Sequence, residues 1–239
     1  MKADVDLPAY TVRVSRRARH VRLTVTPRHG LVVVVPKRWR GDAAAIVADK
    51  QDWARTALAG VAEQHELFLG GAEALLPSTI ELRALTQVWP VEYRTTAAAG
   101  VRARVTGGAL IVSGRVEDAD ACLAAIIRWL DRTSREHLPP MLAETSSACG
   151  VGYVSARVRC QRSRWGSCSS RRTISLNRNL VFLPEHLVVA LMLHELAHTI
   201  VLDHSARFWA ALEAIDPAVA THRLELKRAG SFVPSWAEA

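Results

Sequence analysis

The chain has 239 residues, of which 49% are hydrophobic and 23% are charged. This composition is typical of a globular protein with a substantial core, and it excludes a disordered or fibrous chain. The N-terminus has no apolar run of the secretory type and no segment is long enough to span a bilayer, so we expect a cytoplasmic protein. The four cysteines include no C-x-x-C pair, which disfavours a cysteine-rich zinc knuckle and favours reduced thiols.

The formal net charge of +8 is unevenly distributed. Residues 1–40 carry ten Lys and Arg against two acids, and residues 145–184 carry seven Arg and no acid. Basic blocks of this kind favour anionic partners through long-range attraction. Segments 10–40 and 157–178 are therefore candidate nucleic-acid contacts, although a solvated strand face is an equally simple interpretation.

The first 115 residues show mainly strand patterns. Alternating or β-branched runs predict strands at 10–14, 21–25 and 31–35, and a turn is expected between the last two. Asp42 is a suitable N-cap for a helix that reaches Leu58. A second β-rich stretch is expected from about Leu67 to Val112.

The remaining residues show mainly helical patterns. A helix is predicted from Asp118 to about Leu142, with Pro139 and Pro140 ending or splitting it. Two strands, at 154–158 and 173–176, are expected to enclose an arginine-rich loop. The change in pattern predicts a β-rich N-terminal part, 1–115, and a second part, 116–239, as two units or one continuous domain.

His194, Glu195 and His198 form an H-E-x-x-H motif that follows an apolar run of helical character. Residues four apart share one helix face, so both imidazoles can bind the same ion. Glu195 is rotated by about 100° from His194 and can take a proton from a metal-activated water. Two core histidines without a metal are the alternative, but their desolvation would cost several kcal/mol.

The third metal ligand is predicted to be His204, six residues after His198. This is also the spacing of the metzincin signature, and Asp203, Glu213 and His222 are the alternatives. Three imidazoles with one open position are typical of a catalytic zinc site rather than a structural one. The sequence thus predicts one Zn²⁺ per chain.

The metal helix is expected to continue beyond the second histidine. The position of the metzincin glycine is occupied by Val201, and β-branched residues disfavour positive φ. We therefore expect the helix to reach Leu202, with a bend at Asp203 and with Ser205 as the N-cap of a following helix.

Several motifs together resemble one known family. R-W-G-S-C-S from Arg164, I-S-L-N ending at Asn177, H-E-L-A-H from His194 and H-S-x-x-F-W from His204 are similar to the YgjP-like metallopeptidase family, which is related to SprT-like and WLM-type zinc peptidases. The resemblance covers about residues 10–225. It implies zinc at the three histidines, Glu195 as general base, and the W-G-S-C segment beside the metal helix.

These observations predict an α+β fold with a zincin-like C-terminal part built on the H-E-x-x-H helix. The expected function is zinc-dependent hydrolysis of a peptide bond. The alternatives are a metal-dependent nucleoside-triphosphate pyrophosphohydrolase and a basic nucleic-acid-associated protein with a structural zinc. The candidate substrate-binding residues are Arg162, Arg164, Trp165 and Asn177, whereas Cys168 lacks an identifiable partner base for a nucleophilic role.

Overall fold

The computed structural model describes residues 7–15, 18–26, 30–69, 76–161 and 164–237, with the backbone alone for residues 61–69. The chain forms two compact units, Met1–Glu73 and Ala74–Ala239. Both contain helices and sheets, and the first is rich in strands, so the predicted α+β class is confirmed. The change in composition near residue 115 falls inside the second unit.

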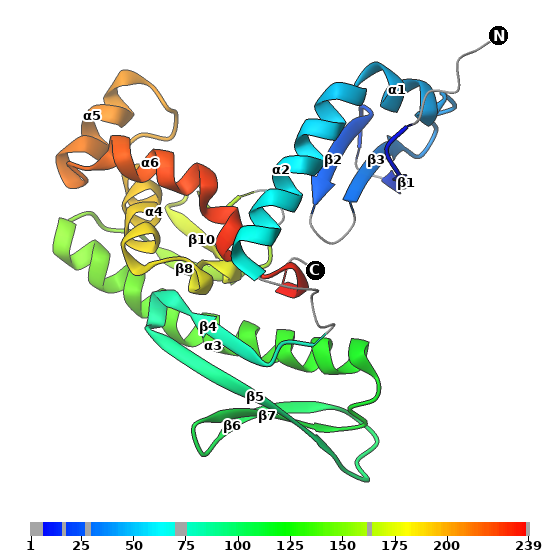
Figure 1. The fold of residues 1–239 in the computed structure, drawn as a ribbon. Coiled ribbons are helices and arrows are strands. Elements are labelled where there is room, and N and C mark those ends of the chain that lie inside the picture. The colour runs from blue at the N-terminus through cyan, green and yellow to red at the C-terminus, as the bar shows by residue number, and fades with distance from the viewer. Residues whose placement is uncertain (1–6, 16–17, 27–29, 70–75, 162–163, 238–239) are drawn as a thin grey trace. The chain divides into compact units, whose positions relative to one another are not determined.

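The first unit is a three-stranded sheet followed by two helices (Figure 1). Its elements are β1 (Tyr10–Ser15), β2 (Arg22–Thr26), β3 (Gly30–Pro36), α1 (Ala43–Asp49) and α2 (Gln51–Leu69). The central strand is β3, parallel to β1 and antiparallel to β2, and its run from Leu31 to Val35 is buried. The three predicted strands are confirmed. Asp42 caps α1 by accepting a hydrogen bond from the Ala44 amide, and the expected single helix is two helices.

The second unit begins with a four-stranded sheet. The strands are β4 (Thr79–Leu82), β5 (Gln87–Thr95), β6 (Arg102–Thr106) and β7 (Ala109–Gly114), with the short helix η1 (Arg83–Leu85) between the first two. Their order is β4-β5-β7-β6, with β5 and β7 parallel. Residues 67–69, where the β-rich stretch was expected to begin, belong to α2, and its first strand among the described residues starts at Thr79.

A long helix, α3 (Ala119–Cys149), follows the sheet. Asp118, the expected first residue of the helix, is its N-cap and accepts a hydrogen bond from the Ala121 amide at 2.9 Å. The expected interruption at Pro139 and Pro140 is wrong, because the helix continues through both prolines to a left-handed Gly150. The buried residues on both sides of the prolines, Leu138 and Leu142, keep this part of the helix packed on the core.

The rest of the second unit contains a small sheet and three helices. Its elements are β8 (Ser155–Arg159), β9 (Gly166–Cys168), β10 (Thr173–Asn177), η2 (Arg178–Phe182), α4 (Glu185–Ala197), α5 (Ala206–Ile215), α6 (Val219–Arg228), η3 (Ala229–Phe232) and η4 (Ser235–Ala237). The central strand is β10, parallel to β8 and antiparallel to β9. The two expected strands are present, and β9 lies inside what the sequence suggested was a loop.

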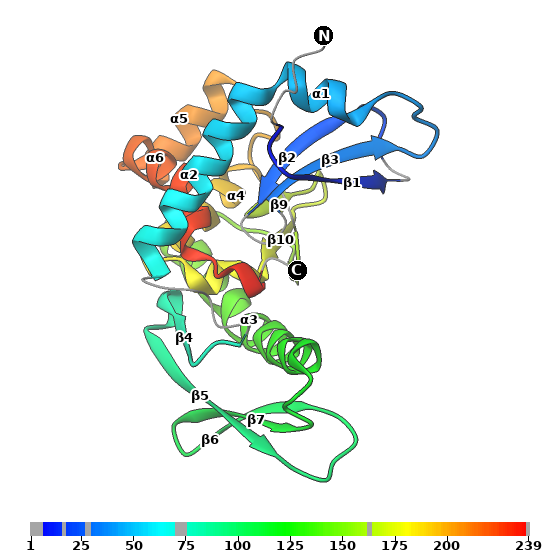
Figure 2. The ribbon, with the colours of Figure 1, turned by 45° about the vertical axis from the view of Figure 1, so that its right-hand side comes forward.

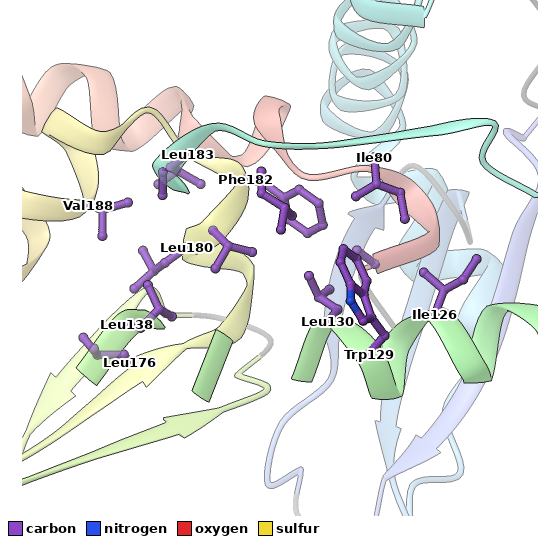
Figure 3. Close-up of a cluster of buried hydrophobic side chains, with 14 of the residues drawn as sticks. Ile80, Ile126, Trp129, Leu130, Leu138, Leu176, Leu180, Phe182, Leu183 and Val188 are labelled. Atoms are coloured by element: carbon purple, nitrogen blue, oxygen red, sulfur yellow. The ribbon is translucent and has the colours of Figure 1, made fainter. Parts of the chain in front are cut away.

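The core of the second unit joins these parts around α3. Figures 1 and 2 show the four-stranded sheet on one side of α3 and the elements from β8 to α4 on another. Trp129 and Leu130 of α3 pack near Phe182 of η2 and Ile80 of β4 (Figure 3). Across the ranges described above, every helix is too short or too polar to cross a membrane.

Candidate metal centre

The H-E-x-x-H motif lies at the C-terminal end of α4. This helix is buried along most of its length, which explains its continuous apolar sequence. His194 and Glu195 lie in its last turn, and His198 is the C-cap residue. The two histidines therefore stay one helical turn apart on one face, as the spacing predicts.

The helix ends earlier than expected. The Thr199 amide donates a hydrogen bond to the Leu196 carbonyl at 2.8 Å, three residues back instead of the four of an α-helix. The Thr199 hydroxyl donates to the same oxygen. The chain then folds back, so that the Val201 carbonyl lies 3.1 Å from Nδ1 of His198. The expected continuation to Leu202 is therefore wrong. Ser205 is the N-cap residue of α5, as predicted.

Three imidazoles converge at this point. Each of the residues His194, His198 and His204 offers one ring nitrogen as a possible metal ligand, and these three nitrogens lie within 4.8 Å of one another. The Nε2 atoms of His194 and His204 are 3.3 Å apart. In His198, the Val201 carbonyl accepts from Nδ1–H, which leaves the lone pair on Nε2 for another partner.

The triad rests on one aromatic ring from α5. Phe208 is completely buried and stacks on His198 with a centroid distance of 4.3 Å, while His194 and His204 meet the same ring edge-to-face. Trp209 donates its Nε1–H to the His204 carbonyl at 3.1 Å. The sequence assigned both aromatics to an amphipathic helix, and only the structure shows that they support the histidines.

Glu195 lies beside the triad in an apolar environment. Its side chain is buried, and Oε2 has no hydrogen-bond partner among the described residues. Burial raises the pKa of Glu195 to about 7, against a smaller lowering effect of the Arg164 charge. The carboxyl group is therefore poised to exchange a proton near neutral pH.

Burial favours the neutral form of His194 and His198. Burial lowers the pKa of His194 to about 4, with further lowering by His198, His204 and Arg223. Burial also lowers the pKa of His198. Metal ligation requires the neutral imidazole, so the clustered lone pairs and the partnerless carboxylate oxygen fit a divalent cation.

The W-G-S-C segment forms the wall next to Glu195. Gly166 lies on β9, where an added Cβ would be 2.7 Å from Oε1 of Glu195. Trp165 is partly buried against the core, and Arg164 is exposed. Arg162 lies outside the described residues. Cys168 has a pKa raised by burial and by the Glu195 charge, which keeps it a thiol and supports no nucleophilic role.

Asn177 organises the loop that leads to this wall. It is buried, and its Nδ2 donates to the carbonyls of Gln161 and Arg164 at 2.7 and 2.9 Å. Its Oδ1 accepts from the Asn179 amide at 3.1 Å. Both polar ends are thus engaged with backbone, and a direct contact of Asn177 with substrate stays a prediction.

The basic segment 157–178 is not uniformly exposed. Arg157, Arg159, Arg164, Arg171 and Arg172 are exposed. Arg178 is buried and pairs with Asp131 of α3 at 3.1 Å, and it also donates to the Ala237 carbonyl. Arg178 is therefore part of the framework of the unit and cannot contribute to an anion-binding surface.

A cavity of about 540 Å³ opens at the triad. It is lined by His194, Glu195 and His204 together with Trp165, Gly166 and residues of α5 and α6.

The residues that the sequence offered as alternatives to His204 for the third ligand have other environments. Asp203 accepts from the Ser205 amide at 3.0 Å, and His222 bonds through Nδ1 to both oxygens of buried Asp216 at 3.0 Å. Glu213 is exposed.

Comparison with known proteins gives one family. Residues 19–229 match the YgjP-like metallopeptidase domain, which is most of the chain. Two solved structures are similar over a smaller part. They are the metallopeptidase zymogens jannalysin of Methanocaldococcus jannaschii, with 18% identity and a TM-score of 0.34, and abylysin of Pyrococcus abyssi, with 24% and 0.33. Each match covers 38% of this chain, and 94% and 93% of those chains. A search of curated proteins gave no match.

The chain belongs to the YgjP-like metallopeptidase family. It is accordingly a hydrolase of the metallopeptidase type, and membership of this family implies a divalent metal ion. The resemblance recognised from the sequence motifs is confirmed.

Proposed function

We propose that the protein is a zinc-dependent peptidase in which His194, His198 and His204 hold the metal ion and Glu195 is the general base. The observation that carries the proposal is a cluster of three imidazoles, of which His194 and His204 line a cavity together with Glu195, a buried carboxylate whose Oε2 has no partner among the described residues. When bound there, a zinc ion would act as a Lewis acid toward water and the substrate carbonyl.

The role of Glu195 follows from its environment. A carboxyl group with a pKa of about 7 is a base strong enough to remove a proton from an activated water and a sufficient acid to return it to the leaving amine. Burial excludes bulk water that would otherwise solvate the carboxylate. The neighbouring Arg164 charge favours the ionised form, which keeps a useful fraction of Glu195 deprotonated at neutral pH.

We infer that the substrate backbone pairs with β9. The other strand of this sheet that is close in sequence, β10, is central and is paired on both sides, so it has no free edge. On either side of β9, the Trp165 carbonyl accepts from the Asn177 amide and the Ser169 amide donates to the Thr173 carbonyl of β10. By alternation, the backbone groups of Gly166 and Cys168 in β9 point to the opposite edge. An edge strand next to the candidate base can bind an extended peptide by strand addition.

The two alternative functions have less support. A structural zinc site ordinarily has four protein ligands, and among the described side chains the triad contributes three. The family to which the chain belongs is described as a metallopeptidase domain, which favours a peptide substrate. The exposed arginines of β8 and the following loop do not by themselves identify a phosphate site.

Metal analysis and a peptide assay test this proposal. The purified protein should contain about one zinc per chain, and His194→Ala and His198→Ala should lose it. Glu195→Gln should keep the zinc and lose about 10²–10⁴-fold in kcat. Wild-type zinc content in both histidine variants, or undiminished peptide cleavage by Glu195→Gln, would refute the assignment. His204→Ala with unchanged zinc affinity would require another third ligand.

A further inference from the structure

One face of α6 forms a wall of the metal cavity. The residues of this helix that line the cavity are Val219, His222, Arg223, Leu226 and Lys227. They follow the spacing i, i+3, i+4, i+7, i+8, which is a single helix face. Figure 1 shows α6 beside α4, which carries the candidate metal site. The side chains on this face of α6 can therefore contact a ligand bound in the cavity.

The wall is cationic. Arg223 and Lys227 have fixed positive charges, whereas the acids that line the cavity are Glu195 and Asp216. Asp216 is already bonded to His222 through both of its oxygens, and Glu195 is buried at the triad. Among side chains that the structure describes, no carboxylate lies within 4.0 Å of Arg223 or Lys227. Both side chains are exposed, so an anionic group of a ligand in the cavity can pair with them.

Arg223 is held close to the candidate metal ligands by an aromatic ring. Its Cζ lies 4.7 Å from the centroid of the Trp209 ring, whose centroid is 5.8 Å from that of His204. A guanidinium that contacts an aromatic ring through its face still donates hydrogen bonds in its own plane. Arg223 lines the cavity, and its charge is one of the causes that lower the pKa of His194.

We propose that Arg223 and Lys227 select substrates with a carboxylate close to the scissile peptide bond. This inference rests on the proposed peptidase function and adds a substrate class to it. Arginine and carboxylate form paired, charge-assisted hydrogen bonds, and Lys227 one turn further along α6 adds a second positive charge. The carboxylate can come from an Asp or Glu side chain or from the C-terminus of a peptide.

A peptide panel distinguishes these two sources. Full-length, zinc-loaded protein is assayed on one cleavable peptide with Asp, Asn or Lys at each of the three positions on either side of the scissile bond. Each peptide is made with a free and with an amidated C-terminus. If the recognised carboxylate is a side chain, kcat/KM should be about 10- to 100-fold higher for the Asp peptide than for the Asn peptide at one position. A terminal carboxylate predicts the same ratio for free over amidated peptides.

Charge reversal assigns the preference to α6. Arg223→Glu and Lys227→Glu should each reduce the preference at least about tenfold, and the double variant should favour the Lys peptide. Arg228→Glu is the matched control, because Arg228 is exposed on the same helix and does not line the cavity. Zinc content and a circular dichroism melt identify misfolding, and Arg223→Gln replaces Arg223→Glu if the charge reversal prevents folding.

The outcomes separate this proposal from the one on which it rests. Equal cleavage of Asp, Asn and Lys peptides, free or amidated, with an inactive Glu195→Gln, would overturn carboxylate selection and leave the peptidase intact. A preference that survives the α6 variants would also overturn it. Hydrolysis of nucleoside triphosphates without cleavage of any peptide would overturn both proposals.

Discussion

Gly166 and Glu195 are in direct contact, and the contact has room for hydrogen but not for a methyl group. A Cβ at residue 166 would lie 2.7 Å from Oε1 and 2.9 Å from both Cδ and Cγ of Glu195. The glycine of the W-G-S-C segment thus sets the position of the candidate base from a neighbouring strand. Its φ is not in the left-handed region, so space rather than backbone conformation explains why glycine occurs there.

Gly166→Ala is therefore expected to displace the Glu195 carboxyl group. We predict a fall in kcat of about 10²-fold or more, since misplacement of a catalytic group by about 1 Å can have this effect, with zinc content unchanged. Gly152→Ala is the matched control, because a Cβ there has no neighbour within 4 Å. Equal activity of the two variants, measured with stability and zinc content, would show that Gly166 does not position the base.

Phe208→Leu tests the aromatic support of the triad. Loss of the ring beneath three imidazoles should weaken zinc binding about 10- to 100-fold, as is typical when groups that orient metal ligands are removed. Phe182→Leu is the control, because Phe182 is equally buried in the core. Chelator competition gives the zinc affinities, and urea unfolding in excess chelator gives the stabilities. If Phe208→Leu and Phe182→Leu lose similar stability and also bind zinc with similar affinity, Phe208 has no specific role in supporting the triad.

The metal-free protein should show the cost of burying Glu195. The pKa of this group is raised from 4.5 to about 7 on folding, so folding favours the protonated form. The ionised form opposes folding by about 3 kcal/mol once both states are deprotonated. This penalty is absent below pH 4.5, grows up to about pH 7 and is constant above it.

Glu195→Gln removes that penalty. In excess chelator, the variant should gain stability relative to wild type as the pH rises from 4.5 to 7, and the gain should then level off. Urea unfolding of both proteins at pH 5, 6, 7 and 8 measures the difference, in which all other titrating groups cancel. A difference that does not change with pH would mean that the pKa of Glu195 is not raised.

The ion pair between buried Arg178 and partly exposed Asp131 is expected to stabilise the fold. Asp131→Asn leaves the Arg178 charge buried without its counter-charge, which should cost about 3–5 kcal/mol. Glu136→Gln, at an exposed acid of the same helix, should change stability by less than about 0.5 kcal/mol. The double variant Asp131→Asn, Arg178→Met should recover part of the loss. Chemical denaturation of the four proteins measures these changes.

The sequence predicted the parts of the molecule that depend on short-range patterns. The strands around residues 10–36 follow from alternation and β-branched runs, and Asp42 and Ser205 were found as helix N-caps because capping needs only neighbouring residues. The grouping of His194, His198 and His204 follows from helical periodicity and a known spacing. These features need no knowledge of distant contacts.

The features that were missed depend on contacts between distant segments. β9 has three residues and exists because β10 pairs with it, which no local pattern indicates. The continuation of α3 through Pro139 and Pro140 depends on the core around it. The early end of α4 is an exception, because it depends on the local bonds from Thr199 to Leu196 and from His198 to Val201. The exposure of an arginine is likewise decided by its neighbours, as Arg178 shows.

The position of α3 has a consequence for how the protein can vary in length. One face of this helix packs on the four-stranded sheet, and other faces pack on β8, η2 and α4. Removing residues 74–115 would expose Ala125, Ile126 and Trp129 to water. These residues lie on α3, which packs against the helix that carries the candidate metal site. We therefore expect shortened forms that begin at residue 116 to aggregate, and natural variants that keep the metal site to keep the sheet as well.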